Sequence, residues 1–208
     1  MKLYRLYLQI EHNNDWSYYT KDFNVKVLVR YYYPFKEQGF SFEVVTVTGT
    51  KSDAVKSFIR RFKYLGNISD IVTVSRINNR TYEVIFLGDL KGMLKYLILN
   101  HGGIVTNVYI NDGIKNFTAY FFKKDIDKLY DSFRELYDEL NNYGKILKFN
   151  VINTSKAPLF TSPIYGLTDI ERRVLQVAFR MGFFDYPRGV SLDDLAREFN
   201  VSKATINI

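Results

Sequence analysis

One unit of sequence occurs three times in succession after Phe42, and this repeat constrains the fold more than any other feature of the chain. Each copy contains a strand-like segment, a turn with Asp or Ser at a helix-capping position, an apolar stripe with helical spacing, a glycine, and a second strand that opens with isoleucine. The copies close at Gly66-Asn67-Ile68, Gly102-Gly103-Ile104 and Gly144-Lys145-Ile146. Strands that alternate with helices and short hairpins predict a mainly antiparallel sheet with helices packed on it.

The predicted helices follow the apolar stripes of the three copies. These stripes lie within residues 55–62, 90–97 and 126–140, where apolar side chains recur every three or four positions. Asp53 and Asp89 are the predicted N-caps of the first two helices.

Two further strands precede the repeat. Residues 3–11 and 24–33 alternate apolar with polar side chains, a turn-like break covers residues 12–15, and Pro34 is expected to end the second strand. This order of elements is that of ferredoxin-like and ACT-like domains, so the predicted fold class is α+β with repeated strand-helix-strand units. Two fused modules, one of them incomplete, and one enlarged sheet both fit the pattern.

The pattern changes near residue 153. Residues 153–166 contain two prolines and several Ser and Thr residues without periodicity, which is typical of a linker. The predicted organisation is a body at residues 1–152 that serves as a sensor or for dimerisation, a linker at 153–166, and an all-α domain at 167–208.

Three short helices are predicted in the C-terminal domain. Thr168 caps a helix whose apolar stripe includes Ile170 and Leu175, Ser191 caps a second helix, and Ser202 caps a third. The last two helices are separated by a turn of only three to four residues, which indicates a helix-turn-helix (HTH).

Several short motifs of this domain occur together in one known family. They are Leu167-Thr168, Val174-Leu175, Ala178, Gly182-Phe183-Phe184, Pro187-Arg188, Ser191-Leu192, Leu195-Ala196, Ser202-Lys203 and Thr205. The combination resembles the archaeal bacterio-opsin activator type of HTH domain, and the segment Gly-Phe-Phe-Asp-x-Pro-Arg is its most specific part. The resemblance covers residues 167–206 and implies a transcription regulator that binds double-stranded DNA.

The resemblance also implies which residues contact DNA. Lys203, Thr205 and Asn207 lie on the DNA-facing helix, and Arg188 and Ser202 are plausible phosphate contacts. The alternative is that these are ordinary solvated helix residues. The recognition helix of the family continues for two or more turns, whereas this sequence stops at residue 208, so we expect either a truncated chain or a vestigial recognition helix, with weak DNA binding by the chain alone.

The positive charge of the chain lies outside the HTH. The net charge is +7, yet residues 167–208 hold six basic and six acidic side chains, so their net charge is zero. Part of the excess lies on the first repeated helix, at Lys56, Arg60, Arg61 and Lys63. Such a run is usually a solvated helix face, and its alternative interpretation is a second nucleic-acid contact.

Two strand-to-helix turns are candidate ligand sites. Gly49, Thr50, Lys51 and Ser52 place a glycine, hydroxyls and a lysine where free amides and a helix dipole favour an anion, and Gly88-Asp89 occupies the corresponding place in the next copy. Ordinary helix capping explains both turns equally well.

Other functional classes find little support. The chain has no Cys and two His, and it contains no phosphate-binding loop, dinucleotide fingerprint or zinc-protease motif, so we expect no enzyme, no cofactor and no metal. Its apolar runs are too short to cross a membrane, which predicts a soluble, cytoplasmic protein. Residues 39–42 faintly resemble the aromatic motif of RNA-binding ferredoxin-like domains.

These observations together predict a sequence-specific DNA-binding transcription regulator whose N-terminal body senses a ligand or mediates dimerisation, with a homodimer as the expected assembly and a small molecule as one candidate effector. The alternatives are a ligand- or protein-binding module with a non-functional HTH and, with less support, an RNA-binding ferredoxin-like protein.

Overall fold

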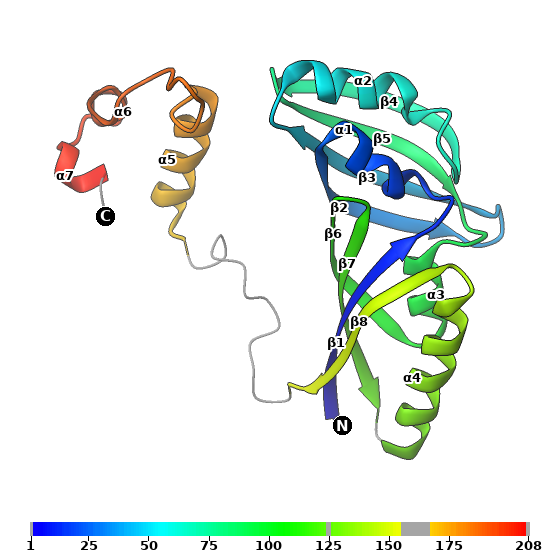
Figure 1. The fold of residues 1–208 in the computed structure, drawn as a ribbon. Helices are drawn as coiled ribbons and strands as arrows, with labels where there is room; N and C mark the ends of the chain where they lie inside the picture. Colours follow the sequence, from blue (N-terminus) through cyan, green and yellow to red (C-terminus); the bar gives the residue numbers. More distant parts are fainter. Residues whose placement is uncertain (1, 124–125, 155–166, 207–208) are drawn as a thin grey trace. The chain divides into compact units, whose positions relative to one another are not determined.

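The computed structural model describes residues 2–123, 126–154 and 167–206 (Figure 1). The chain divides into two compact units, Met1–Ser155 and Lys156–Ile208. The elements of the first unit, in chain order, are β1 (Lys2–His12), η1 (Trp16–Tyr19), α1 (Thr20–Phe23), β2 (Val25–Phe35), β3 (Phe40–Gly49), α2 (Ser52–Phe62), β4 (Ile68–Asn78), β5 (Thr81–Asp89), α3 (Leu94–Asn100), β6 (Gly103–Asn111), β7 (Ile114–Lys123), α4 (Ile126–Asn141) and β8 (Gly144–Asn153).

The strands of the first unit form one sheet of eight strands in the order β4-β5-β3-β2-β6-β7-β1-β8. All neighbouring strands are antiparallel. The fold class is therefore α+β, and the eight strands form one continuous sheet.

In sequence, the first unit has two halves, β1–β4 and β5–β8. The first strand of each sequence half lies in the half of the sheet that the other sequence half forms. β1 lies between β7 and β8, and β5 lies between β3 and β4. The two halves, β4-β5-β3-β2 and β6-β7-β1-β8, thus exchange one strand each. Direct pairing between them is limited to Lys26–Val29 of β2 with residues 108–111 of β6. The exchanged strands therefore connect the halves more strongly than this short ladder does.

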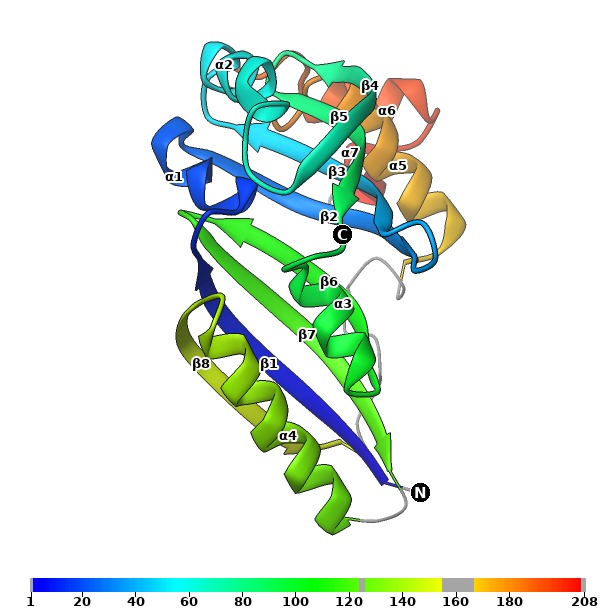
Figure 2. The same cartoon turned by 90° about the vertical axis from the view of Figure 1, so that its right-hand side faces the viewer.

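The helices of the first unit cover one face of the sheet, as Figure 2 shows. Alternate side chains of β1, including Leu6, Leu8 and Ile10, point to this face and are fully buried. Val55, Phe58 and Phe62 of α2 pack against the same core, as their three- and four-residue spacing predicts.

The N-terminal pair of strands also encloses helical structure, which the sequence analysis missed. Asp15 caps η1 by accepting a hydrogen bond from the Ser17 backbone N–H at 2.9 Å, and α1 follows directly. The predicted break at residues 12–15 is thus the start of a helical segment. Every consecutive pair β1–β2, β3–β4, β5–β6 and β7–β8 therefore has the order strand-helix-strand.

Two predicted caps and one predicted strand end are wrong. Asp53 lies in the first turn of α2, where Lys51 is the N-cap residue. Asp89 ends β5, and its Oδ1 accepts a hydrogen bond from the Lys91 N–H at 3.0 Å because Asp side chains readily bond to a following turn. β2 continues through Pro34 to Phe35. Among the described residues, β2 pairs with β6 only up to Val29 and with β3 alone beyond it, so a proline is tolerated at this unpaired edge.

The second unit is helical. Its elements are α5 (Asp169–Arg180), α6 (Leu192–Glu198) and α7 (Lys203–Ile206). Ala178 of the predicted α5 stripe is buried, but Ile170 is 74% exposed, so that side chain does not face a core within the described residues. β8 reaches Asn153, and most of the predicted linker, residues 155–166, lies outside the described residues. None of the helices in residues 2–123, 126–154 and 167–206 is both long and apolar enough to span a membrane.

Candidate nucleic-acid interface

Reciprocal capping boxes fix the starts of α5 and α6. Thr168 Oγ1 accepts a hydrogen bond from the Glu171 N–H at 3.3 Å, while the Glu171 carboxylate accepts from the Thr168 N–H at 2.7 Å. Ser191 and Asp194 form the same box, and their hydrogen bonds lower the pKa of Asp194. Both caps were predicted from the sequence, and each contributes about 1 kcal/mol to its helix.

A tight turn joins α6 to α7. Leu195 and Ala196 of α6 are buried, and the Val201 N–H donates to the Ala196 carbonyl at 3.0 Å. Asn200 adopts a left-handed conformation with φ of 51°, which Asn tolerates better than most residues. Ser202 Oγ then accepts from the Thr205 N–H at 3.2 Å, as the predicted cap requires. This arrangement places the first turn of α7 outward, as an HTH needs.

The segment between α5 and α6 closes on itself. The Gly189 N–H donates to the Gly182 carbonyl at 2.9 Å, and the Phe183 N–H donates to the Ala178 carbonyl at 2.9 Å. The Arg188 guanidinium lies over the Phe183 ring, 4.8 Å from its centroid. This stacking holds Arg188 in place, a contact that sequence reasoning did not predict.

The structure brings two of the predicted DNA-contacting side chains to one hollow. Arg188 and Lys203 both line a hollow of about 550 Å³ beside Ser191 and Asp193. Lys203 Nζ lies 2.9 Å from Asp193 Oδ2, and both side chains are exposed. Exposed ion pairs contribute little stability, so phosphate could displace Asp193 at small cost.

The remaining predicted DNA contacts are less well placed. The hydroxyls of Ser202 and Thr205 lie 2.8 Å apart, where they serve the cap. Asn207 lies outside the described residues.

The predicted second contact lies on α2 of the first unit. Arg60, Arg61 and Lys63 are exposed, and Lys56 Nζ lies 3.9 Å from an oxygen of the exposed Asp53. The side of α2 that carries them is opposite to the buried Val55, Phe58 and Phe62.

The two predicted ligand turns are not brought together. Gly49, Thr50, Lys51 and Ser52 lie where β3 leads into α2, and the Gly49 N–H donates to the Arg80 carbonyl. Gly88 lies opposite Ser41, at the other end of the β3–β5 ladder. Asp89 lines a separate pocket, together with His12, Asn67 and Tyr143.

The comparisons with known proteins agree with the geometry of the second unit. Residues 167–207 match the HTH_10 family, an HTH DNA binding domain of the bacterio-opsin activator type. No curated protein matches the chain. A cluster of His, Cys, Asp or Glu suited to a metal ion is absent from the parts of the chain that the structure describes. The match covers the HTH alone and suggests a DNA-binding transcription regulator.

Proposed function

We propose that this protein is a sequence-specific transcription regulator in which the HTH contacts double-stranded DNA and residues 1–155 form a regulatory body. The observation that carries the proposal is the capped α6-turn-α7 arrangement within a segment that matches an HTH DNA binding domain. The body is proposed to be built from two ferredoxin-like modules that exchange β1 and β5, and to bind partners without catalysing a reaction.

The charge distribution supports DNA contacts from both units. The HTH is electrically neutral overall, so Arg188 and Lys203 alone supply little of the counterion release that drives DNA binding. The exposed basic side of α2 carries Arg60 and Arg61, and Lys63 follows as the C-cap residue of the helix. We therefore propose α2 as a second, sequence-independent contact with DNA phosphates.

A salt titration of the whole chain tests the proposal. Binding to a pool of random duplexes of roughly 25 base pairs is measured between about 50 and 200 mM salt. We expect affinity to fall as salt rises, and Arg188→Ala and Lys203→Ala to reduce the slope of log K against log salt by about one each. Arg180→Ala is the control, because Arg180 is an exposed basic residue of the same unit outside the hollow. No binding at low salt would overturn the proposal.

An aromatic surface supports self-association of the body. The helix-free face of β2 and β3 carries five rings, here called the aromatic patch: Tyr31, Tyr33, Phe35, Phe40 and Phe42. Tyr33 pairs with Phe42 across the strands, and the Phe35 and Phe40 centroids are 5.1 Å apart. Tyr31 is 54% and Tyr33 51% exposed. Contiguous exposed apolar surface is typical of interaction sites, so we propose that the patch forms a homodimer contact.

Light scattering of the whole chain tests the dimer. We expect a dimer that Tyr33→Lys converts to a monomer and that Tyr64→Lys leaves intact. Tyr64 is the control because it is 84% exposed and lies in the turn after α2. A monomeric natural chain, or a dimer that survives Tyr33→Lys, would contradict the proposal. Single-stranded RNA binding that Tyr33→Lys abolishes would favour the RNA-binding alternative.

A further inference from the structure

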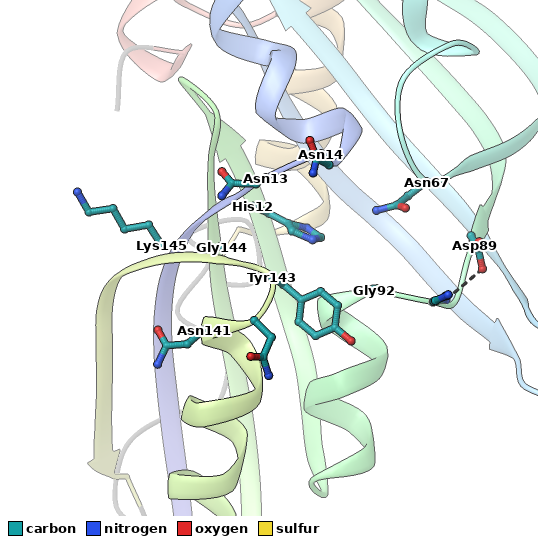
Figure 3. A pocket seen from close by; sticks show the side chains of 12 residues that line it. His12, Asn13, Asn14, Asn67, Asp89, Gly92, Asn141, Tyr143, Gly144 and Lys145 are labelled. Carbon is teal, nitrogen blue, oxygen red and sulfur yellow. Dashed lines mark hydrogen bonds between the residues drawn. The ribbon is translucent and has the colours of Figure 1, made fainter.

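A polar pocket lies where the two halves of the sheet exchange strands. It has a volume of about 720 Å³, within the usual range for small-molecule sites. Four loops line it: those that follow β1 and β5, and those that precede β4 and β8. Figure 3 shows His12, Asn67, Tyr143 and Gly92 around the central space. The two sequence halves of the first unit, β1–β4 and β5–β8, therefore each supply two loops to one pocket.

Backbone hydrogen bonds hold these loops together. The Asn13 N–H donates to the Tyr143 carbonyl at 3.2 Å, and the Asp89 N–H donates to the Asn67 carbonyl at 3.2 Å. Each of these bonds joins a loop that follows an exchanged strand to a loop that precedes β8 or β4. The walls are thus fixed before any ligand enters, which reduces the entropic cost of binding.

The side chains that line the pocket are amides and cations. Five asparagines contribute donors and acceptors: Asn13, Asn14, Asn67, Asn141 and Asn142. Lys91 and Lys145 add two positive charges at the pocket, against one carboxylate, Asp89, and the exposed Lys145 side chain points away from the central space in Figure 3. The lining therefore favours a ligand with a negative charge and several polar groups.

His12 forms a wall of the pocket and rests on a buried ionic network. Its Nδ1 lies 3.1 Å from Lys115 Nζ, which is 2.8 Å from Asp15 Oδ1. Asn67 Nδ2 donates to the other Asp15 oxygen at 3.2 Å. All three residues of the network, His12, Asp15 and Lys115, are less than 5% exposed.

Two charged groups face Nδ1 of His12: Lys115 Nζ at 3.1 Å and Asp15 Oδ2 at 3.5 Å. Because Lys115 is the closer and an ammonium group can only donate, we assign Nδ1 as the acceptor and place the ring proton on Nε2. Burial, followed by the charge of Lys115, lowers the pKa of His12 to about 4, so the ring is neutral at physiological pH. Within the described residues Nε2 has no hydrogen-bond partner, although the ring lines the pocket. A single N–H donor at the pocket wall is thus left to a ligand.

We propose that this pocket binds a small organic anion. Lys91 holds a carboxylate or phosphate, and the flexible Lys145 side chain turns inward to join it. The asparagine amides bond to a polar body, and His12 Nε2–H donates to one acceptor. Binding itself is independent of DNA. Its use as the effector site of the body rests on the proposed function.

Calorimetry of the whole chain without DNA tests this proposal with two probes. AMP represents a phosphate on a polar body and citrate represents carboxylates, while adenosine is the uncharged comparison. We expect millimolar or tighter binding of at least one anion and at least about tenfold weaker binding of adenosine. AMP binding alone identifies a phosphate ligand, and citrate binding alone identifies a carboxylate. If neither anion binds at about 10 mM, the proposal is wrong.

Variants then locate the binding site. Lys145→Ala and Asn142→Ala change exposed side chains, so both variants should fold. Each should weaken binding, by about tenfold for the lysine. Lys148→Ala, an exposed lysine three positions further along β8, is the matched control and should bind normally. Binding that Lys145→Ala and Asn142→Ala leave unchanged would place the anion elsewhere and overturn the proposal. A chain that binds the anion but not DNA would refute the proposed function alone.

Discussion

Acid should weaken the fold of the first unit because His12 stays neutral in the native state. Burial and the Lys115 ammonium lower the pKa of His12 from 6.5 to about 4. In the unfolded chain the imidazole titrates near 6.5, so between these values the unfolded state binds more protons than the native state. His12 therefore costs no stability above pH 6.5 and reduces stability progressively as the pH falls from 6.5 toward 4.

The expected loss follows from the gap between the two pKa values. At about 1.4 kcal/mol per pKa unit, His12 accounts for about 2 to 3 kcal/mol between pH 7 and pH 4.5. Asp15 acts in a different range. Burial alone would raise its pKa, but Lys115, His12 and its hydrogen bonds hold it well below the ordinary 3.8. Asp15 therefore loses its stabilising effect only as the pH falls below 3.8.

Trp16 provides the assay. It is the sole tryptophan of the chain, it is 2% exposed, and its ring packs against Phe62 and Phe86. Its fluorescence therefore reports unfolding of the first unit and not of the HTH. Urea titrations of the whole chain at pH 7 and about pH 4.5 give the free energies of unfolding.

The comparison with His12→Gln isolates the histidine. A glutamine oxygen can still accept from Lys115, but it does not titrate. Between pH 7 and about pH 4.5, the free energy of unfolding should fall by about 2 to 3 kcal/mol more in the natural chain than in the variant. The contributions of the other titrating groups are the same in both proteins and cancel in this comparison. Equal losses would refute the reasoning. An NMR titration of the two histidines would then measure the pKa of His12 directly.

Two further predictions concern the junction between the halves. A Cβ at Gly66 would overlap the Asn14 carbonyl, and a Cβ at Gly144 would overlap the Glu11 carbonyl. Alanine at either position should therefore lower the free energy of unfolding in urea by at least about 2 kcal/mol. Gly39→Ala meets no atom within 4 Å and should cost only about 1 kcal/mol, for its left-handed φ. Lys95 Nζ lies 2.8 Å from the buried Glu43 carboxylate, so Lys95→Met would leave that carboxylate charged without its cation. This variant should lower the free energy of unfolding by about 3 to 5 kcal/mol. Adding Glu43→Leu should recover most of that loss, and a strictly additive double variant would contradict the pairing.

Local patterns were sufficient to predict most strands and helices. Alternation in β1 and helical spacing in α2 reflect which side chains face the core, and both are visible in sequence. The segment from Trp16 to Phe23 was missed because two short helical pieces give no periodic stripe. The exchange of β1 and β5 leaves no local signal, because both strands bury one face in either position.

The pocket was missed for a different reason. Asn13, Asn14, Asn141 and Asn142 are ordinary turn residues in sequence, and only the strand exchange brings their loops together. One signal was present in the neighbouring core. Glu43 lies between Ser41 and Val45 on the inward-facing positions of β3, where a charged residue demands a partner. Reading that position as a buried ion pair would have predicted polar chemistry near the junction, although not its partner.

The strand that begins at the pocket is also the last described strand before the HTH in the sequence. β8 starts at Gly144 in the pocket wall and ends at Asn153, before the segment that connects the units. Among the described strands it pairs only with β1, and that pairing shifts register between Gln9 and Ile10, near the pocket. An edge strand held on one side can shift with fewer lost hydrogen bonds than an inner strand. The proposed ligand would contact Asn142 and Lys145, at the start of the last described strand before the HTH in the sequence. Any such coupling is reciprocal, so bound DNA must change the affinity for the anion by the same factor as the anion changes the affinity for DNA.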